Sequence, residues 1–376
     1  MTMLGWALFA AGLVLTFAAY LVDHRHAAFN NVIGLLLLIS VAVGALFLIA
    51  LEYLTGAVWS VPMRRIVEFI GGLVVLVPLL AIPLFFSLHQ VFEWTHVNSV
   101  TQDRLLMAKA PYLNEYFFFA RFVVFAALWI VFYRLFTRNS LRQDTVQEAT
   151  FTRRNVRLGA LFMPIFAITI TFTAVDWIMS IEPHWFSTIL GVYYFSGTLL
   201  AALGVATYFI ITLHENGSLP NLRRDHFYSL GALMFVFTNF WAYIAFSQFM
   251  LTWYANLPEE TFWFIKRWQN GWEYVSVLLI IVRFAVPYAV LLSQDAKMDP
   301  RRLKIMAIWM LVAHVLDLYW LTMPTFSSNV TISWIEISTP MLVAGVIILM
   351  VSYKMKRHNL IPVGDPKLKR GWDFHL

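Results

Sequence analysis

The chain has no cysteine and carries few charged residues. None of its 376 residues is Cys, and only 13% are Asp, Glu, Lys or Arg. Without thiols it can form no disulfide, no thiolate-bound iron–sulfur cluster and no haem attached through a Cys-x-x-Cys-His motif. Soluble domains carry about 25% charged residues. The low charge content therefore excludes a water-soluble globule.

Apolar residues dominate instead, at 60% of the chain. They lie in uninterrupted runs of about 20 residues, the length of an α-helix that crosses a bilayer. No ten-residue alternation typical of a membrane β-barrel interrupts these runs. The sequence therefore predicts an all-α polytopic membrane protein with ten transmembrane helices. The predicted spans are about residues 3–22, 31–54, 66–88, 113–136, 157–181, 186–213, 227–256, 272–292, 303–323 and 332–353.

The basic residues indicate the topology. An even number of spans puts both termini on one side of the membrane. Two of the 27 Lys and Arg residues, Arg121 and Arg283, lie inside spans, and all but five of the others fall on the side of the termini. The exceptions are Arg25, Arg104, Lys109, Lys266 and Arg267. This bias predicts cytoplasmic termini.

The basic charges do not predict nucleic-acid binding. They give a net charge of +6 but are dispersed along the chain, so they form no single footprint for a nucleic acid. We expect the basic inner loop (137–157) and the tail (354–376) to contact anionic membrane lipid.

A short pattern recurs four spans apart. Asp176 to Pro183 near the end of the fifth span has the same spacing as Asp317 to Pro324 in the ninth. Glu115-Tyr116 and Glu273-Tyr274 open the fourth and eighth spans, and each pair is followed within its span by an arginine.

An offset of four spans preserves orientation, so the pattern predicts a parallel repeat. We expect two four-helix bundles, spans two to five and six to nine, with the first and last spans as peripheral helices. The corresponding division is 1–30, 31–185, 186–325 and 326–376. Chance similarity between short aromatic-rich segments is the alternative.

Ionisable residues inside spans are the candidate functional groups. A carboxylate near hydrocarbon costs roughly 2.5 to 3.5 kcal/mol on insertion scales unless it faces a partner, water or the protein interior. A quinol site also needs an apolar slot and an acid or imidazole near each hydroxyl. The candidates for a proton relay are Asp176, Arg121, His314, Asp317, Arg283 and Glu273. The candidates for a quinol headgroup or an outer proton exit are Glu182, His184 and Tyr274.

Two interpretations of the acids stay open. Asp176 with Arg121, and Asp317 with Arg283, can be static ion pairs that fix the bundles. Asp317 with His314, three residues apart on one helix face, favours proton traffic, because a protonatable imidazole adds nothing to a static pair. A haem b is not expected, because His314 is the only histidine well inside a span and paired axial ligands are required. No metal ligand set is predicted.

Two runs resemble a known family. The run from Phe246 to Thr261, which contains Trp-Tyr-Ala-Asn-Leu-Pro-Glu-Glu-Thr, and the run from Asp176 to Phe186 are similar to those of the NrfD-like membrane subunits of bacterial alternative complex III. The similarity is greatest to the second of the two such subunits in that complex, and it extends over nearly the whole chain.

This resemblance implies an integral subunit of a respiratory quinol:electron-acceptor oxidoreductase in the bacterial inner membrane. The acceptor would be a cytochrome c or a terminal oxidase. The implied partners are a second NrfD-like subunit, an iron–sulfur subunit and a multihaem cytochrome c. Iron–sulfur clusters and haem c would sit only in those partners, with no covalently bound cofactor here and quinol or menaquinol as a candidate ligand. The implied role is proton translocation or coupling, with quinol binding as a further expectation. A redox-inert scaffold subunit and an ion or solute transporter are the alternatives.

Overall fold

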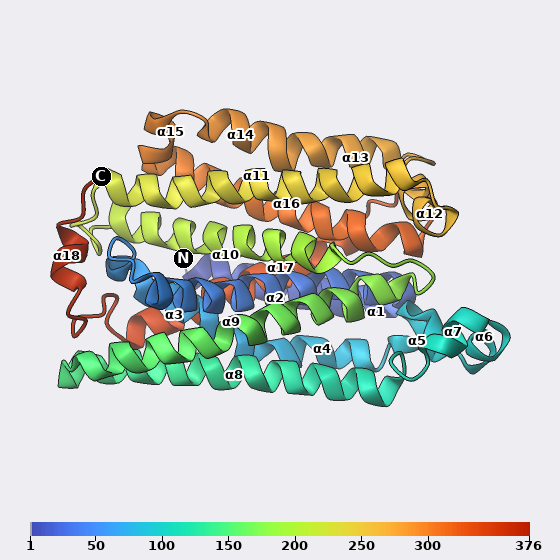
Figure 1. Ribbon diagram of the computed structural model, residues 1–376, viewed down its shortest axis with the longest axis horizontal. Coiled ribbons are helices and arrows are strands. Elements are labelled where there is room, and N and C mark those ends of the chain that lie inside the picture. Colours follow the sequence, from blue (N-terminus) through green and yellow to red (C-terminus); the bar gives the residue numbers. More distant parts are fainter. Residues whose placement is uncertain (1) are drawn as a thin grey trace.

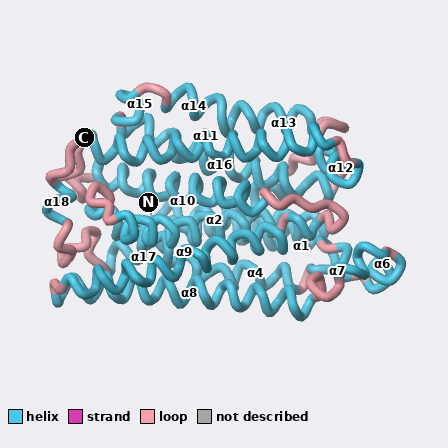
Figure 2. The backbone as a smooth tube through the Cα atoms, in the orientation of Figure 1, coloured by secondary structure: helices cyan, strands magenta, loops and turns pink. Residues whose placement is uncertain are grey.

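The computed structural model describes residues 2–376, which are mostly helical and include no strand. Ten helices or helix series are long and apolar enough to cross a membrane. They lie side by side along one long axis (Figure 1), joined by short loops (Figure 2). The predicted all-α fold is confirmed, and the number of candidate spans equals the predicted ten.

Most of the spans are single long helices, and two are series of shorter ones. The single helices are α1 (Thr2–Val22), α2 (His24–Thr55), α8 (Glu115–Val146), α9 (Ala149–Trp177) with η4 (Met179–Ile181) at its end, α10 (Leu190–Glu215), α11 (Arg224–Ala255), α16 (Pro300–Phe326) and α17 (Ile335–Arg357). The third span is the series η1 (Val61–Met63), α3 (Arg64–Gly71), η2 (Gly72–Leu76) and α4 (Val77–Phe85). The eighth span is the series α13 (Trp272–Ile280), η5 (Ile281–Ala285) and α14 (Val286–Leu291).

The shorter helices lie between the spans. They are α5 (Leu88–Val91), η3 (Glu93–Thr95), α6 (Val97–Gln102), α7 (Arg104–Lys109), α12 (Pro258–Lys266), α15 (Gln294–Met298) and α18 (Leu368–Trp372). The two ends of the chain lie toward one end of the molecule, and α5 to α7 and α12 lie at the other (Figure 1).

Two helices, α2 and α10, form the centre of the molecule. In the most apolar 18-residue stretch of each helix, 89% of α2 and 94% of α10 is buried, against 17% of α1. Such helices are apolar on all sides and so pack against neighbours all round. A Cβ on Gly44 of α2 would lie 2.6 Å from the carbonyl oxygen of Thr198 in α10, so the glycine allows this close contact.

Several helices extend beyond their hydropathy runs. The predicted basic loop at 137–157 is wrong as a loop, because α8 continues to Val146 and α9 begins at Ala149, so only Gln147 and Glu148 connect them. Hydropathy records only the apolar part of a helix, whereas Arg, Gln and Leu are good helix formers in water as well. Gln147 makes the turn with a left-handed φ of 55°.

Candidate functional site

Asp317 of α16 lies at the centre of a buried polar site. The hydroxyl of Tyr193, from α10, donates to Asp317 Oδ1 at 2.5 Å, and the indole Nε1 of Trp241, from α11, donates to Oδ2 at 3.2 Å. Arg283 Nε lies 3.2 Å from the same Oδ2, so the predicted ion pair is formed. Asp317 and Arg283 are each only 2% exposed. Three other spans therefore supply partners to a single carboxylate.

A π-helical segment positions Arg283. Residues Ile281–Ala285 (η5) form a wider turn within the eighth span. Pro287 follows, and because proline has no N–H it cannot donate to the carbonyl of Arg283 four residues earlier. The loss of that bond favours a local widening of the helix, and such π segments are frequent at functional sites.

His314 contacts Arg283, not Asp317. Its Nδ1 lies 3.1 Å from Arg283 Nη2, and its Nε2 lies 3.0 Å from the hydroxyl of Ser40 in α2. A guanidinium can only donate, so Nδ1 must be the accepting nitrogen and the imidazole is neutral with its proton on Nε2. Because His314 and Asp317 lie on the same face of α16, both side chains contact Arg283.

A hydroxyl chain continues from His314 toward α10. Ser40 donates to the hydroxyl of Tyr194 at 3.1 Å, and Tyr194 donates to the carbonyl of Leu36 at 2.8 Å. All of these side chains are buried. Gly197 leaves the room that this packing needs, because a Cβ there would lie 2.8 Å from His314 Cε1 and 2.9 Å from Arg283 Nη2.

A pocket lies directly beside Asp317. It has a volume of about 520 Å³, and Tyr193 and Trp241, the two hydrogen-bond donors to Asp317, form part of its wall. The rest of the wall is mainly aromatic and includes Trp268 and Trp320. The side chain of Gln248 lines it too, is 6% exposed and has no hydrogen-bond partner for its Nε2 among residues 2–376. The sequence analysis did not predict Gln248 as a site residue.

Asp176 forms a second, more tightly bound ion pair. Arg121 Nε and Nη2 donate to its two oxygens, each at 2.9 Å, and the hydroxyl of Tyr112 donates to Oδ1 at 2.9 Å. Arg121 Nη1 also donates to the carbonyl of Tyr112 at 2.9 Å. The predicted Asp176–Arg121 pair is thus formed as a bidentate fork, which is a strong and directional arrangement.

The outer candidates Glu182 and His184 have partners in the loops. Glu182 is buried and accepts from Lys266, and Arg267 Nη1 lies 4.0 Å from it. His184 Nε2 lies 2.5 Å from Asp103 Oδ2, and this hydrogen bond lowers the pKa of Asp103. Burial lowers the pKa of Arg267 to about 9, which leaves it charged at neutral pH.

Glu273 and Tyr274 lie at the start of α13. Glu273 Oε2 accepts from the backbone N–H of Gly271 at 3.0 Å, which satisfies a donor at the helix start. Tyr274 is 76% exposed. The structure therefore brings Asp317, Arg283 and His314 together and brings Asp176 and Arg121 together elsewhere. The other four candidates, Glu182, His184, Glu273 and Tyr274, lie outside both groups.

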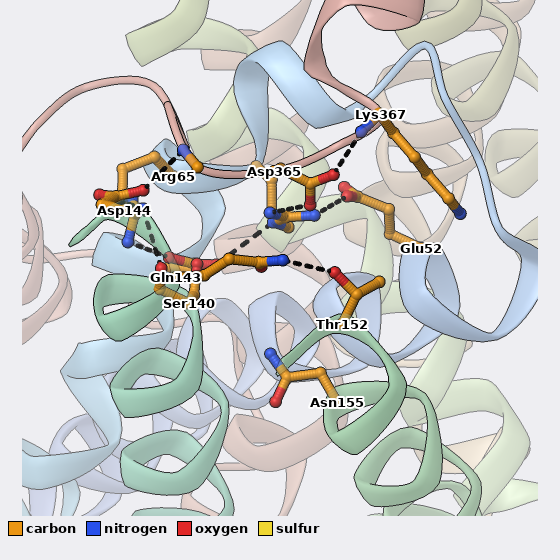
Figure 3. A network of polar contacts seen from close by, with 12 residues as sticks. Glu52, Arg65, Ser140, Gln143, Asp144, Thr152, Asn155, Asp365 and Lys367 are labelled. Atoms are coloured by element: carbon orange, nitrogen blue, oxygen red, sulfur yellow. Dashed lines mark hydrogen bonds and ion pairs between the residues drawn. The ribbon is translucent and has the colours of Figure 1, made fainter. Parts of the chain in front are cut away.

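A third polar cluster lies at the end of the molecule near the C-terminal helix α18. Arg64 Nη1 and Nη2 donate to Glu52 at 3.0 Å and to Asp365 at 2.7 Å. Arg65 donates to Glu68 at 3.0 Å. It also donates to Asp144 at 2.7 Å (Figure 3). Both arginines are buried. The charge count along the sequence places both arginines on the side of the termini but does not predict that they are buried and paired with acids from four segments.

No protein-family model matches this chain, and no curated protein matches it. The function must therefore be argued from the sites. The Asp317 site joins a carboxylate, an imidazole and three hydroxyls in a buried network, beside a pocket for an apolar ligand, and such groups can take up and pass on protons.

Proposed function

We propose that this chain is the proton-handling membrane subunit of a bacterial respiratory quinol:electron-acceptor oxidoreductase. The observation that carries the proposal is Asp317, a buried acid among apolar helices with donors from three other spans. Ionisable groups in such places typically mark proton pathways. The run from Phe246 to Thr261 supports the kind of complex, through its similarity to subunits of alternative complex III.

Arg283 would couple two proton sites. It pairs with Asp317 and also donates to His314 Nδ1. A proton on Asp317 cancels the charge that holds Arg283, and a shift of Arg283 would uncover Nδ1 for a proton. With Arg283 in place, a proton on His314 would meet a neighbouring positive charge. The two sites would therefore be protonated in different positions of this one side chain.

The electrons would pass outside this chain. Without cysteine it offers no thiolate for a cluster. We place the clusters and the haem c groups in an iron–sulfur subunit and a multihaem cytochrome c subunit, beside a second NrfD-like subunit. The assembly would deliver electrons to a cytochrome c or a terminal oxidase, in the cytoplasmic membrane, with both termini of this chain in the cytoplasm.

The first test is Asp317→Asn in the native assembly. We expect slower quinol:acceptor turnover, by at least about tenfold if proton transfer is a general acid–base step, and a lower proton yield in vesicles. Asp176→Asn is the matched control, because its acid is held in a bidentate pair. Normal turnover and normal proton yield in the Asp317 variant would leave the chain as a redox-inert scaffold.

A solute or ion transporter is the remaining rival. Such a protein would work without redox partners, so isolation of the chain from the membrane discriminates between the two. We expect multihaem and iron–sulfur proteins to copurify with it. Transport of an ion or solute by the purified chain alone, with no redox protein attached, would contradict the proposal.

Quinol binding is the second function that we propose, in the pocket beside Asp317. Its volume of about 520 Å³ lies in the range of small-molecule sites. Aromatic side chains can stack on a quinol ring, and the amide of Gln248 can hydrogen-bond to a quinol oxygen. A quinol oxidised there would release two protons, with Asp317 behind Tyr193 as a first acceptor, and two electrons to a partner's cluster or haem.

A photoreactive quinone tests this site. We expect it to label the pocket in the wild-type assembly, and Gln248→Leu to raise the KM for quinol several-fold. Gln269→Leu, at an exposed position, is the control. Labelling of other subunits only, with an unchanged KM, would remove the pocket from the proposal. Glu182, His184 and Tyr274 stay candidates for the outer proton exit.

We also propose that the two-bundle organisation and the parallel repeat hold. Support comes from the two Asp–Arg pairs, four spans apart, each completed by a tyrosine hydroxyl on Asp Oδ1. In this organisation α2 and α10 are equivalent central helices, and α1 packs on α17 outside the bundles.

A further inference from the structure

The end of α8 carries a row of arginines with no acidic partner. Arg134, Arg138 and Arg142 are exposed, and within residues 2–376 none of them forms an ion pair or donates a side-chain hydrogen bond. Their spacing of four residues puts them on one helix face. Like charges at this spacing destabilise a helix. The arrangement therefore favours an anion bound along the row.

A groove accompanies the row. It has a volume of about 640 Å³ and is lined by the three arginines together with Tyr133, Thr137 and Leu141. The hydroxyl oxygen of Thr137 is buried and has no hydrogen-bond partner among the described residues. Lys354 of α17 donates to the hydroxyl of Tyr133, one of the residues that line the groove. The groove thus offers charge and a free hydroxyl to one ligand.

The row lies at the depth of lipid headgroups. At 1.5 Å per residue, Arg134 is roughly 29 Å along α8 from Glu115, and Arg142 is roughly 40 Å along it. A hydrocarbon core is about 30 Å thick, and a bilayer with its headgroups is about 40 to 45 Å thick. Arg134 to Arg142 therefore spans one headgroup layer, at the end of the molecule that holds α18 (Figure 1).

Apolar side chains continue the row toward the core. Val131 lies seven residues before Arg138, Val124 lies seven before Val131, and the two are 49% and 53% exposed. A soluble anion would make no use of this stripe, whereas an acyl chain would cover it. An anionic phospholipid matches both features, with its headgroup at the arginine row and an acyl chain along the apolar stripe.

We propose that this groove is a specific binding site for the headgroup of an anionic phospholipid. The three guanidiniums bind its phosphate oxygens, the Thr137 hydroxyl donates to one of them, and an acyl chain follows Val131 and Val124. The site is independent of the proton and quinol proposals, because it lies on the exposed face of α8, away from Asp317 and its pocket.

The test is a lipid titration of the full-length chain in a zwitterionic detergent, read by native mass spectrometry. The probes are dioleoylphosphatidylglycerol, dioleoylphosphatidylcholine and inorganic phosphate. We expect phosphatidylglycerol to bind, phosphatidylcholine to bind far more weakly, and millimolar phosphate not to displace the lipid. The triple variant Arg134→Gln, Arg138→Gln, Arg142→Gln should bind phosphatidylglycerol on the order of a hundredfold more weakly, at about fivefold per lost contact.

A second triple variant is the matched control. Arg153→Gln, Arg154→Gln, Arg157→Gln removes the same charge from the start of α9, outside the groove. We expect this control to lose less than about a fifth of the binding free energy that the first triple variant loses. Thr137→Val, which keeps the charge, should weaken binding several-fold. Equal losses in the two triple variants, no loss in the first, or displacement by phosphate would each overturn the proposal.

Discussion

Asp317 and Asp176 are held in different ways, although each lies seven residues before a proline. Arg121 engages both oxygens of Asp176 through two parallel hydrogen bonds. Arg283 approaches one oxygen of Asp317 through Nε alone, and that N–H is not aligned for a hydrogen bond. A fork fixes both groups, whereas a single contact leaves the arginine freer to move. This difference is why we place proton traffic at Asp317 and a structural role at Asp176.

Replacing Arg121 tests the structural role. Arg121→Gln leaves Asp176 buried without its counter-charge, so we expect the free energy of unfolding to fall by about 3 kcal/mol or more. Unfolding in mild detergent, followed by loss of helicity, measures this. Arg224→Gln is the control, because its contact with Asp295 is exposed and longer, at 3.8 Å. Equal stability of the two variants would show that the fork contributes nothing.

Gly197 provides a test of the close packing around His314. Gly197→Ala places a methyl group where His314 and Arg283 now lie, so we expect one of them to move and turnover to fall while the helix itself gains propensity. Gly204→Ala, on the same helix, is the control: its added carbon would meet the backbone of α16 at 3.0 Å and no titratable group. A similar turnover in both variants would argue against a role for this contact.

One departure from regular α-helix lies at the site itself. The π turn of η5 carries Arg283, and Pro287 has no N–H to donate to the carbonyl of that residue. A regular α-helix would change the direction of the Arg283 side chain relative to Asp317, because a π turn inserts an extra residue.

Pro287→Ala should therefore separate stability from function. It restores an N–H and a good helix former, so we expect unchanged or higher stability together with reduced turnover, measured by thermal unfolding and a quinol:acceptor assay. Pro164→Ala, inside α9 and away from the site, is the control. If Pro287→Ala left turnover unchanged, the π turn would have no part in the mechanism.

At the scale of the whole molecule, the C-terminal tail is bound into the helix bundle. Asp365 of the tail is 5% exposed and accepts from Arg64, which also binds Glu52 of α2. The backbone of Gly364 lies so close to α8 that a Cβ would fall 1.8 Å from the carbonyl oxygen of Gln143. The tail thus connects helices that are distant in sequence.

Asp365→Asn should loosen this end of the molecule. It takes one anion from a buried pair, so we expect the free energy of unfolding to drop by about 2 to 4 kcal/mol and the tail to become more accessible to protease. Asp373→Asn is the control, at an exposed position of the same tail. Equal proteolysis of the two variants would contradict a stabilising role for Asp365.

The sequence by itself determined the helical class and the number of apolar spans, and it offered the two Asp–Arg pairs as one of two interpretations of the buried acids. These follow from local quantities: the length of apolar runs, and the rarity of a charge within them, which requires a partner. The tertiary structure alone decided that His314 contacts Arg283 and Ser40, that Arg64 and Arg65 are buried, and that Gln248 faces a pocket. Those contacts join residues up to 301 positions apart, as in Arg64 with Asp365. They depend on how helices rotate and pack against each other, which hydropathy along one chain does not specify.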